Sequence, residues 1–200
     1  MFIIFDRQIP TMAADDGVPY KYNLNFRNLF RTTEELFGSR EIVYLDRRVK
    51  YREFFQRTRR ICNGLREIGV QEGDVVGVLD WDTMTYMELY FAVPLRGAVL
   101  HTVNIRYPPE LIYLTMAHAG DKYVVIRDEF VPLIENYASL FDFVKGWIIY
   151  SDTGKIPETK LSPVYNYDDL AKGPECDPPD LDENTWATIF YTSGTTGMPK

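Results

Sequence analysis

Apolar residues return at every third or fourth position in several segments of this chain, which is the period of an α-helix with one buried face. Glycine or proline stands near the end of most of these segments, as expected where a helix stops. The pattern predicts helices over residues 24–37, 52–68 and 131–140, a helix capped by Asp82 or Thr83 that runs to about Pro94, and a helix from Pro108 to Gly120.

Short runs of apolar residues lie between these helices, and they are typical of strands that are buried on both faces of a parallel sheet. Such strands are expected over residues 74–79, 98–103, 123–126, 147–150 and 186–191, with a short extended pair at 41–45 and 49–51. Strands that alternate with helices of this length are joined by right-handed crossovers. The predicted fold class is therefore α/β, an open, doubly wound, mostly parallel sheet with helices on both faces.

The same pattern divides the chain into four segments. Residues 1–20 form an amino-terminal extension, and residues 21–150 form the α/β subdomain. Residues 151–184 are rich in Pro, Asp and Gly, so they should form a long surface excursion without regular structure. Residues 185–200 combine the last strand with a candidate phosphate-binding loop.

The loop after the last predicted strand has an unusual composition. Its glycines allow consecutive backbone N–H groups to point toward one centre, while its hydroxyls and its lysine add donors and a positive charge. The residues concerned are Thr192, Ser193, Gly194, Thr195, Thr196, Gly197 and Lys200. Because α/β sheets collect ligands at the carboxyl ends of their strands, the pattern predicts a phosphate site. A flexible surface loop is the alternative interpretation of the same composition.

The sequence of residues 191–200, YTSGTTGMPK, resembles the phosphate-binding signature of the adenylate-forming enzymes: acyl-CoA synthetases, luciferases and peptide-synthetase adenylation domains. Residues 49–54, 65–76 and 97–99 are similar to further motifs of that family. Residues 88–91, 100–106 and 118–121 most resemble the medium- and long-chain fatty-acyl-CoA synthetases, whereas Asp82 and Arg96 depart from residues common among them. The resemblance covers nearly the whole chain and implies the amino-terminal α/β subdomain of that fold.

The resemblance implies a two-step ligase reaction with ATP, Mg²⁺, coenzyme A and a fatty acid. The carboxylate attacks the α-phosphorus of ATP to give acyl-AMP and pyrophosphate, and the thiol of coenzyme A then displaces AMP. The residues implied to contact the phosphates are Thr192, Ser193, Gly194, Thr195, Thr196, Gly197 and Lys200. Thr192 or a neighbouring hydroxyl is also implied to help hold Mg²⁺.

The family keeps its acyl tunnel, a metal-binding glutamate and the catalytic lysine in a part that these 200 residues do not contain. No catalytic residue is therefore assigned in this chain. Since positioning of both reactants supplies much of the rate of a ligase, we expect no turnover from this chain alone.

Charge and cysteine content indicate which classes of partner and which cellular compartment the chain fits. The net charge of -7 and a pI near 4.9 give no overall positive field for nucleic acid or anionic lipid. Cys62 and Cys176 are too few for a disulfide framework, which favours a reducing cytoplasm. Residues 1–5 are shorter than a signal-peptide core, and no window reaches the roughly 20 apolar residues of a membrane span.

Several polar residues have a structural and a functional interpretation. His101 is expected to be a hydrogen-bonded residue of the core or its rim rather than a catalytic base. Asn104 and Arg106 fit a cleft lining and an ordinary turn equally well. His118 is expected to interact with the last carbonyl groups of its helix. Asp80 is expected to be a charge at a strand end.

Two other classes of function stay open at this point. An isolated subdomain would expose apolar surface, which favours a non-catalytic interaction module, including a homodimer. A module that only binds nucleotide would need the loop and nothing else.

Overall fold

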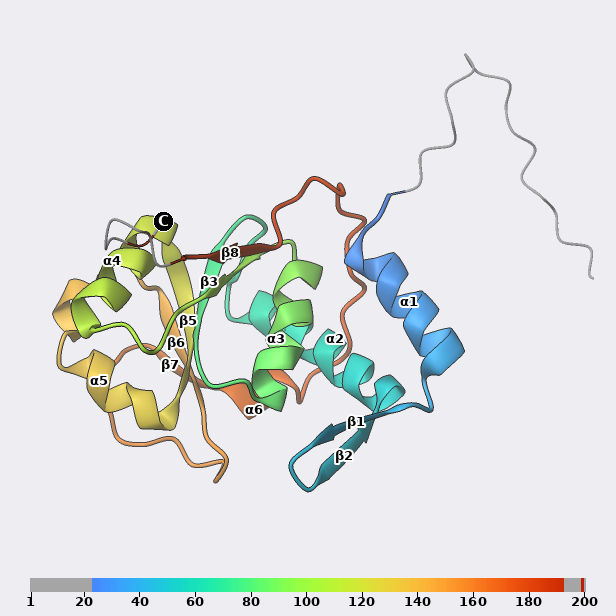
Figure 1. The fold of residues 1–200 in the computed structure, drawn as a ribbon, viewed down its shortest axis with the longest axis horizontal. Coiled ribbons are helices and arrows are strands. Elements are labelled where there is room, and N and C mark those ends of the chain that lie inside the picture. Colours follow the sequence, from blue (N-terminus) through green and yellow to red (C-terminus); the bar gives the residue numbers. More distant parts are fainter. Residues whose placement is uncertain (1–22, 193–198, 200) are drawn as a thin grey trace, which may run out of the picture.

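The computed structural model describes residues 23–192 and residue 199. These residues form a six-stranded sheet with the order β7-β6-β5-β3-β4-β8, in which every pair of neighbours is parallel (Figure 1). The strands are β3 (Val75–Leu79), β4 (Val99–Thr102), β5 (Asp121–Arg127), β6 (Gly146–Tyr150), β7 (Val164–Asn166) and β8 (Thr188–Phe190).

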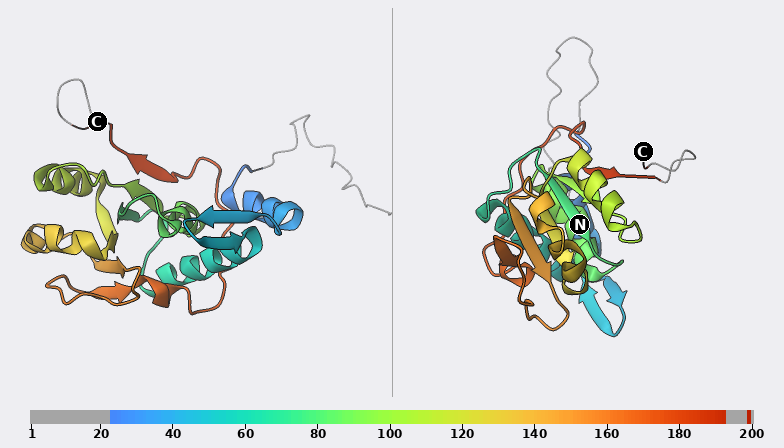
Figure 2. Two further views of the ribbon diagram at one scale, coloured as in Figure 1. Left: turned by 60° about the horizontal axis from the view of Figure 1, so that its bottom comes forward. Right: turned by 90° about the vertical axis from the view of Figure 1, so that its left-hand side faces the viewer.

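Helices cover both faces of this sheet, as Figure 1 shows. One face packs against α2 (Tyr51–Glu67), α3 (Met84–Leu95) and α6 (Tyr167–Leu170), and α1 (Phe26–Phe37) packs on α2 and α3. The other face packs against α4 (Pro109–Ala119) and α5 (Val131–Glu135). An antiparallel hairpin of β1 (Glu41–Tyr44) and β2 (Arg47–Lys50) lies outside the sheet (Figure 2).

A cluster of buried apolar side chains lies on each face of the sheet, and strand β5 contributes to both. Tyr123 and Val125 belong to the core beneath α2 and α3, whereas Val124 and Ile126 belong to the core beneath α4 and α5. Successive side chains of a strand point to opposite faces, so a strand that is buried on both faces must be apolar throughout. The predicted fold class, an open, doubly wound α/β sheet, is confirmed.

The choice of cap at the start of α3 is settled by geometry. The side chain of Thr83 accepts a hydrogen bond of 3.1 Å from the backbone N–H of Tyr86, whereas Asp82 is exposed. Thr83 is therefore the N-cap.

The predicted helix over residues 131–140 is wrong in its length. Helix α5 ends at Glu135, and a separate 3₁₀ turn covers Ala138–Leu140. The side-chain amide of Asn136 donates a 2.9 Å hydrogen bond to the carbonyl of Pro132, the acceptor that a continuing helix would offer to its own backbone. Such competition by asparagine is a common reason for a helix to stop.

The expectation that residues 151–184 lack regular structure is wrong for one part of the segment. Strand β7 pairs with β6 in parallel, and α6 follows it directly. Tyr167 of α6 is fully buried, and its hydroxyl donates a 2.8 Å hydrogen bond to Glu88. Elements of three and four residues are too short to show a period of their own, so pairing and packing create them.

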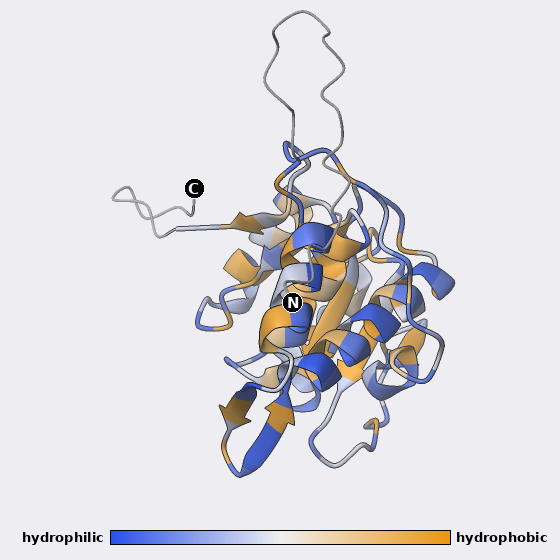
Figure 3. Ribbon diagram, turned by 90° about the vertical axis from the view of Figure 1, so that its right-hand side faces the viewer, coloured by the Kyte–Doolittle hydropathy of each residue, from blue (hydrophilic) through white to orange (hydrophobic). Residues whose placement is uncertain are grey.

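Strand β8 forms an edge of the sheet and pairs only with β4 among the described strands. Figure 2 shows β8 at the margin of the molecule, and Figure 3 shows it as an apolar strand. Its Phe190 is 67% exposed, and Trp186 just before it is 73% exposed. Few packing contacts therefore hold this strand.

Replacing Gly64 with alanine should destabilise the fold. A Cβ atom there would lie 2.5 Å from the carbonyl oxygen of Leu170, where α2 and α6 meet. We expect Gly64→Ala to lower the free energy of unfolding by about 1–3 kcal/mol, although alanine is the better helix former. Gly173→Ala, whose Cβ would have 3.5 Å of space, is the matched control with a change of about 0.5 kcal/mol or less. Urea denaturation of both variants measures this, and equal midpoints would contradict it.

Candidate functional site

The carboxyl ends of the parallel strands meet at one edge of the sheet, where α/β proteins bind ligands. Asp80 follows β3, Asp128 follows β5, Ser151 follows β6 and Tyr191 follows β8. Thr192 is exposed next to Tyr191, at the start of the predicted phosphate-binding loop. The other residues predicted for that loop, Ser193, Gly194, Thr195, Thr196, Gly197 and Lys200, lie outside the described residues.

Tyr191, the residue before the loop, contacts two histidines from different elements. Its hydroxyl lies 2.6 Å from Nδ1 of His118 in the last turn of α4. Its ring stands edge-on to the His101 ring, with 5.2 Å between the ring centres. The hydrogen bond of His118 thus goes to Tyr191, which differs from the expected interaction with the helix carbonyls.

His101 is a core residue, as expected, and its partner is Asp121. Both side chains are 0% exposed, and Nδ1 of His101 lies 2.9 Å from each carboxylate oxygen of Asp121. The two residues come from β4 and β5, which flank β3 on opposite sides. The pair therefore spans the middle strand.

Gly77 of β3 makes this span sterically allowed. It is aligned with His101 in β4, and a Cβ atom at Gly77 would lie 2.4 Å from Oδ2 of Asp121. Any side chain at position 77 would therefore collide with the carboxylate.

Burial determines the ionisation of Asp121. Removal from water raises the pKa of its carboxyl group to about 6, although the hydrogen bond and the charge of His101 act in the opposite direction. Burial disfavours the charged carboxylate, and the imidazole partner offsets only part of that cost.

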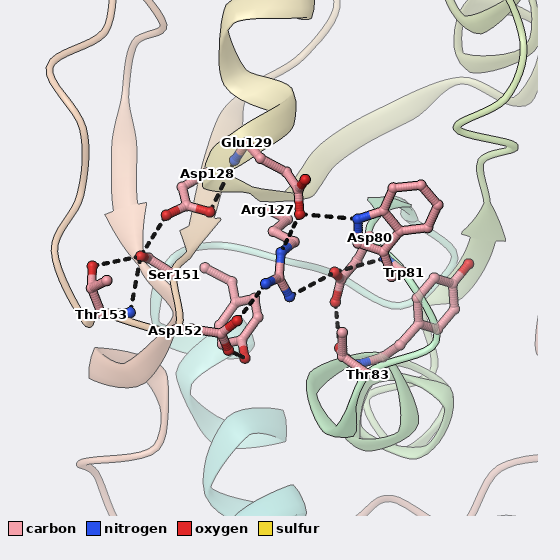
Figure 4. Close-up of polar contacts among 11 residues, drawn as sticks. Asp80, Trp81, Thr83, Arg127, Asp128, Glu129, Ser151, Asp152 and Thr153 are labelled. Atoms are coloured by element: carbon pink, nitrogen blue, oxygen red, sulfur yellow. Dashed lines mark hydrogen bonds and ion pairs between the residues drawn. The ribbon is translucent and has the colours of Figure 1, made fainter. Parts of the chain in front are cut away.

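A second cluster gathers at the carboxyl ends of β3, β5 and β6 (Figure 4). Arg127 forms ion pairs with Glu129 at 2.6 Å and with Asp152, and its guanidinium lies 3.7 Å from Asp80. Asp80 is buried and accepts a 2.5 Å hydrogen bond from Thr83. Arg127 therefore offsets three carboxylates that would otherwise repel one another.

The pKa values of two of these carboxylates move in opposite directions. Burial raises the pKa of Asp80, and the hydrogen bond from Thr83 opposes that shift. The hydroxyl of Tyr150 lowers the pKa of the exposed Asp152, with a further contribution from Arg127.

A polar cavity of about 460 Å³ lies beside this cluster and is lined in part by Arg57, Glu88 and Asp168. Nε of Arg57 lies 2.9 Å from Glu88, and its Nη2 lies 2.8 Å from Asp168. Because these charges are paired with one another, the cavity does not by itself indicate a ligand.

Asn104 is a turn residue. Its side-chain oxygen accepts a 3.0 Å hydrogen bond from the backbone N–H of Arg106, and its carbonyl accepts one of 3.1 Å from Tyr107. Arg106 is exposed. The structure thus shows a turn at these residues, and a cleft-lining role stays a prediction. Among residues 23–192 and 199, no three His, Cys, Asp or Glu side chains are arranged to hold a metal ion.

Sequence reasoning did not single out Tyr191, Asp121 or Arg127 as site residues. Gly77 carried a usable signal, since a glycine inside an apolar strand often marks a close approach of another group. No comparable signal pointed to Arg127, which becomes informative only when β3, β5 and β6 are aligned.

The structure belongs to the class of open, doubly wound α/β proteins, which bind ligands at the carboxyl edge of the sheet. The AMP-binding enzyme family model matches residues 30–200, and the chain belongs to that family. It is 36% identical over 182 residues to a long-chain-fatty-acid–CoA ligase of Thermus thermophilus, covering 88% of this chain and 32% of that protein. It is 31% identical over 170 residues to a medium-chain-fatty-acid–CoA ligase of Ectopseudomonas oleovorans, covering 82% of this chain and 31% of that protein.

Solved structures show the same fold at lower identity. The anthranilate CoA ligase AuaEII matches with a TM-score of 0.78 and 19% identity, over 90% of this chain and 34% of that one. The N-terminal subdomain of Klebsiella oxytoca NpsA matches with a TM-score of 0.63 and 21% identity, over 87% and 39%. The chain thus spans about a third of the length of the ligases it matches. None of its described helices is both long and apolar enough to cross a membrane.

The free energy of unfolding should depend on pH because Asp121 is buried. The pKa of its carboxyl group in the folded protein, about 6, lies above the ordinary value of 3.8. The protonated carboxyl group therefore adds its full share to the free energy of unfolding below pH 3.8, and this share is lost as the pH rises through 6. Asp121→Asn cannot ionise, so its stability relative to wild type should rise by about 2 kcal/mol between pH 4 and pH 7.

Urea denaturation at the two pH values measures this difference. Asp142→Asn, at an exposed position before β6, is the control and should show no such trend. A difference between wild type and Asp121→Asn that does not change with pH would contradict the argument.

Proposed function

We propose that this chain is the phosphate-binding part of an ATP-dependent fatty-acyl-CoA ligase. The observation that carries the proposal is the position of Tyr191 and Thr192, which follow β8 at the carboxyl edge of the parallel sheet and directly precede residues 193–200 in the sequence. The names of the relatives at 36% and 31% identity support a fatty acid as the substrate. The reaction joins a carboxylate and ATP into acyl-AMP and pyrophosphate, followed by transfer to coenzyme A.

In this proposal the loop acts on the leaving group of the first step. Negative charge accumulates on the β- and γ-phosphates as the bond to the α-phosphorus breaks, and donors that are already in place stabilise it. The donors are the hydroxyls of Thr192, Ser193, Thr195 and Thr196, the backbone N–H groups next to Gly194 and Gly197, and the ammonium group of Lys200. The hydroxyl of Thr192 suits Mg²⁺, which prefers oxygen ligands.

The described residues fit this role in their chemistry. Arg127 offsets part of the negative charge of Asp80, Glu129 and Asp152 at the sheet edge, which lowers their repulsion toward a triphosphate. A cytoplasmic location is part of the proposal, because two cysteines, Cys62 and Cys176, are too few for the disulfide framework of a small secreted domain.

The chain alone should not turn over. We expect acyl-CoA formation from ATP, coenzyme A and fatty acids of graded length only when a polypeptide that supplies the remaining two thirds of a family enzyme is added. Turnover by the chain alone, well above background, would contradict the expectation that the chain needs the remaining part of a family enzyme for catalysis. Inactivity of a folded mixture with every acid would contradict the ligase proposal.

In an active mixture, Lys200→Ala should lower kcat/KM by about 10- to 100-fold, because one charge-assisted hydrogen bond to phosphate is lost. Lys155→Ala, at an exposed position far along the chain from the loop, is the control and should stay within about twofold. Equal rates for both variants would remove Lys200 from the site.

A second candidate, a non-catalytic interaction module, is favoured by the exposed apolar side chains at the β8 edge. An apolar edge strand is a template for pairing with another chain. If this is the function, the chain should sediment as a dimer, and Phe190→Lys should convert it to a monomer. A wild-type monomer at micromolar concentration would contradict this candidate. MgATP binding without turnover in any mixture would instead indicate a module that only binds nucleotide.

A further inference from the structure

The weakest strand of the sheet leads directly into the proposed phosphate-binding loop. Strand β8 has three residues, pairs with β4 alone among the described strands, and leaves Thr188 and Phe190 exposed. Backbone pairing by so short an edge strand gives little resistance to local opening. Another contact must therefore fix the direction in which the chain leaves the sheet.

We propose that Tyr191 is a positioning residue of the phosphate-binding loop, held by His118 on one side and by the buried His101–Asp121 pair on the other. The proposal rests on the function proposed above and goes beyond it, because it assigns a role to four residues outside the loop. The ligand concerned is the triphosphate of ATP.

The first contact fixes the outer end of the Tyr191 side chain. The hydroxyl lies 2.6 Å from Nδ1 of His118, which belongs to α4 and not to the strand that it restrains. The contact forms with either protonation of the imidazole nitrogen, since the hydroxyl can donate to a bare Nδ1 or accept from a protonated one. It joins the end of β8 to a helix that is packed on the core.

The second contact fixes the ring itself. The Tyr191 ring stands at 65° to the His101 ring, with their centres 5.2 Å apart, an edge-to-face arrangement. His101 cannot yield easily, because it is fully buried and its Nδ1 is held by both oxygens of Asp121. The absence of a side chain at Gly77 is what allows this restraint to cross β3.

One peptide unit separates Tyr191 from Thr192, so the position of the tyrosine sets where the loop begins. A displacement of about 1 Å in a group that orients substrate can cost on the order of 100-fold in rate. Anchoring the residue before the loop thus restricts the loop without using any of its own phosphate donors.

The test uses variants that remove one contact at the surface. Tyr191→Phe deletes only the hydroxyl, and His118→Ala deletes its partner. Each should weaken MgATP binding by about 3- to 10-fold with little change in the melting temperature. The double variant should be no weaker than His118→Ala alone, because that change already removes both the hydrogen bond and the ring contact between His118 and Tyr191. Tyr137→Phe, at an exposed tyrosine between α5 and the 3₁₀ turn that follows it, is the control and should bind like wild type.

In an active mixture with the remaining part of the ligase, Tyr191→Phe should raise the KM for ATP and leave the KM for the fatty acid unchanged. A loss of stability alone would lower the amount of active enzyme without separating the two KM values. Additive losses in the double variant, or equal rises in both KM values, would overturn the proposal.

A readout without nucleotide separates this proposal from the proposed function. Amide hydrogen exchange at Thr192 should be several-fold faster in Tyr191→Phe and His118→Ala than in wild type. If the wild-type chain binds no MgATP but exchange at Thr192 is faster in both variants than in wild type, the phosphate-binding function fails and the positioning role of Tyr191 stands. If exchange at Thr192 is the same in all three proteins, the positioning role of Tyr191 is wrong, whatever the chain binds.

Discussion

Parallel pairing is the constraint on which the rest of this structure depends. Because the six strands of the large sheet all run in one direction, their carboxyl ends share one edge, and every loop that leaves that edge is brought to the same side of the molecule. The pairing also requires helical crossovers, which cover both faces and make the strands apolar throughout. The location of the candidate site is a consequence of this arrangement.

The strand order divides that edge into two regions of different chemistry. Carboxylates follow β3, β5 and β6, and Arg127 pairs with them. The proposed phosphate loop leaves β8, beyond β4, where Tyr191 contacts His118 and His101. In the proposed function, Lys200 supplies a positive charge for the triphosphate.

The sequence allowed the fold class and most elements to be predicted, because burial on both faces leaves a strong pattern in strands such as β3 and β5. It did not reveal β7, whose three residues become a strand only by pairing with β6. The end of α5 was also missed, since it depends on the side chain of Asn136 competing for a backbone acceptor. Both errors concern short elements in which local competition outweighs periodicity.

The loop itself was predicted from composition and resemblance, whereas the residues around its first position were not. His101 and Asp121 lie 20 residues apart and meet only across a third strand, so no spacing rule connects them. Tyr191 and His118 are separated by 73 residues. Contacts of this kind follow from topology, and Gly77 was the one position at which the sequence hinted at them.

The most direct test of the account is the ³¹P NMR spectrum of MgATP titrated with the 200-residue chain. If the loop binds the pyrophosphate portion of ATP, the β- and γ-phosphorus resonances should shift or broaden more than the α resonance, and added pyrophosphate should reverse the change. A folded chain that leaves all three resonances unchanged at millimolar concentration would contradict the central claim.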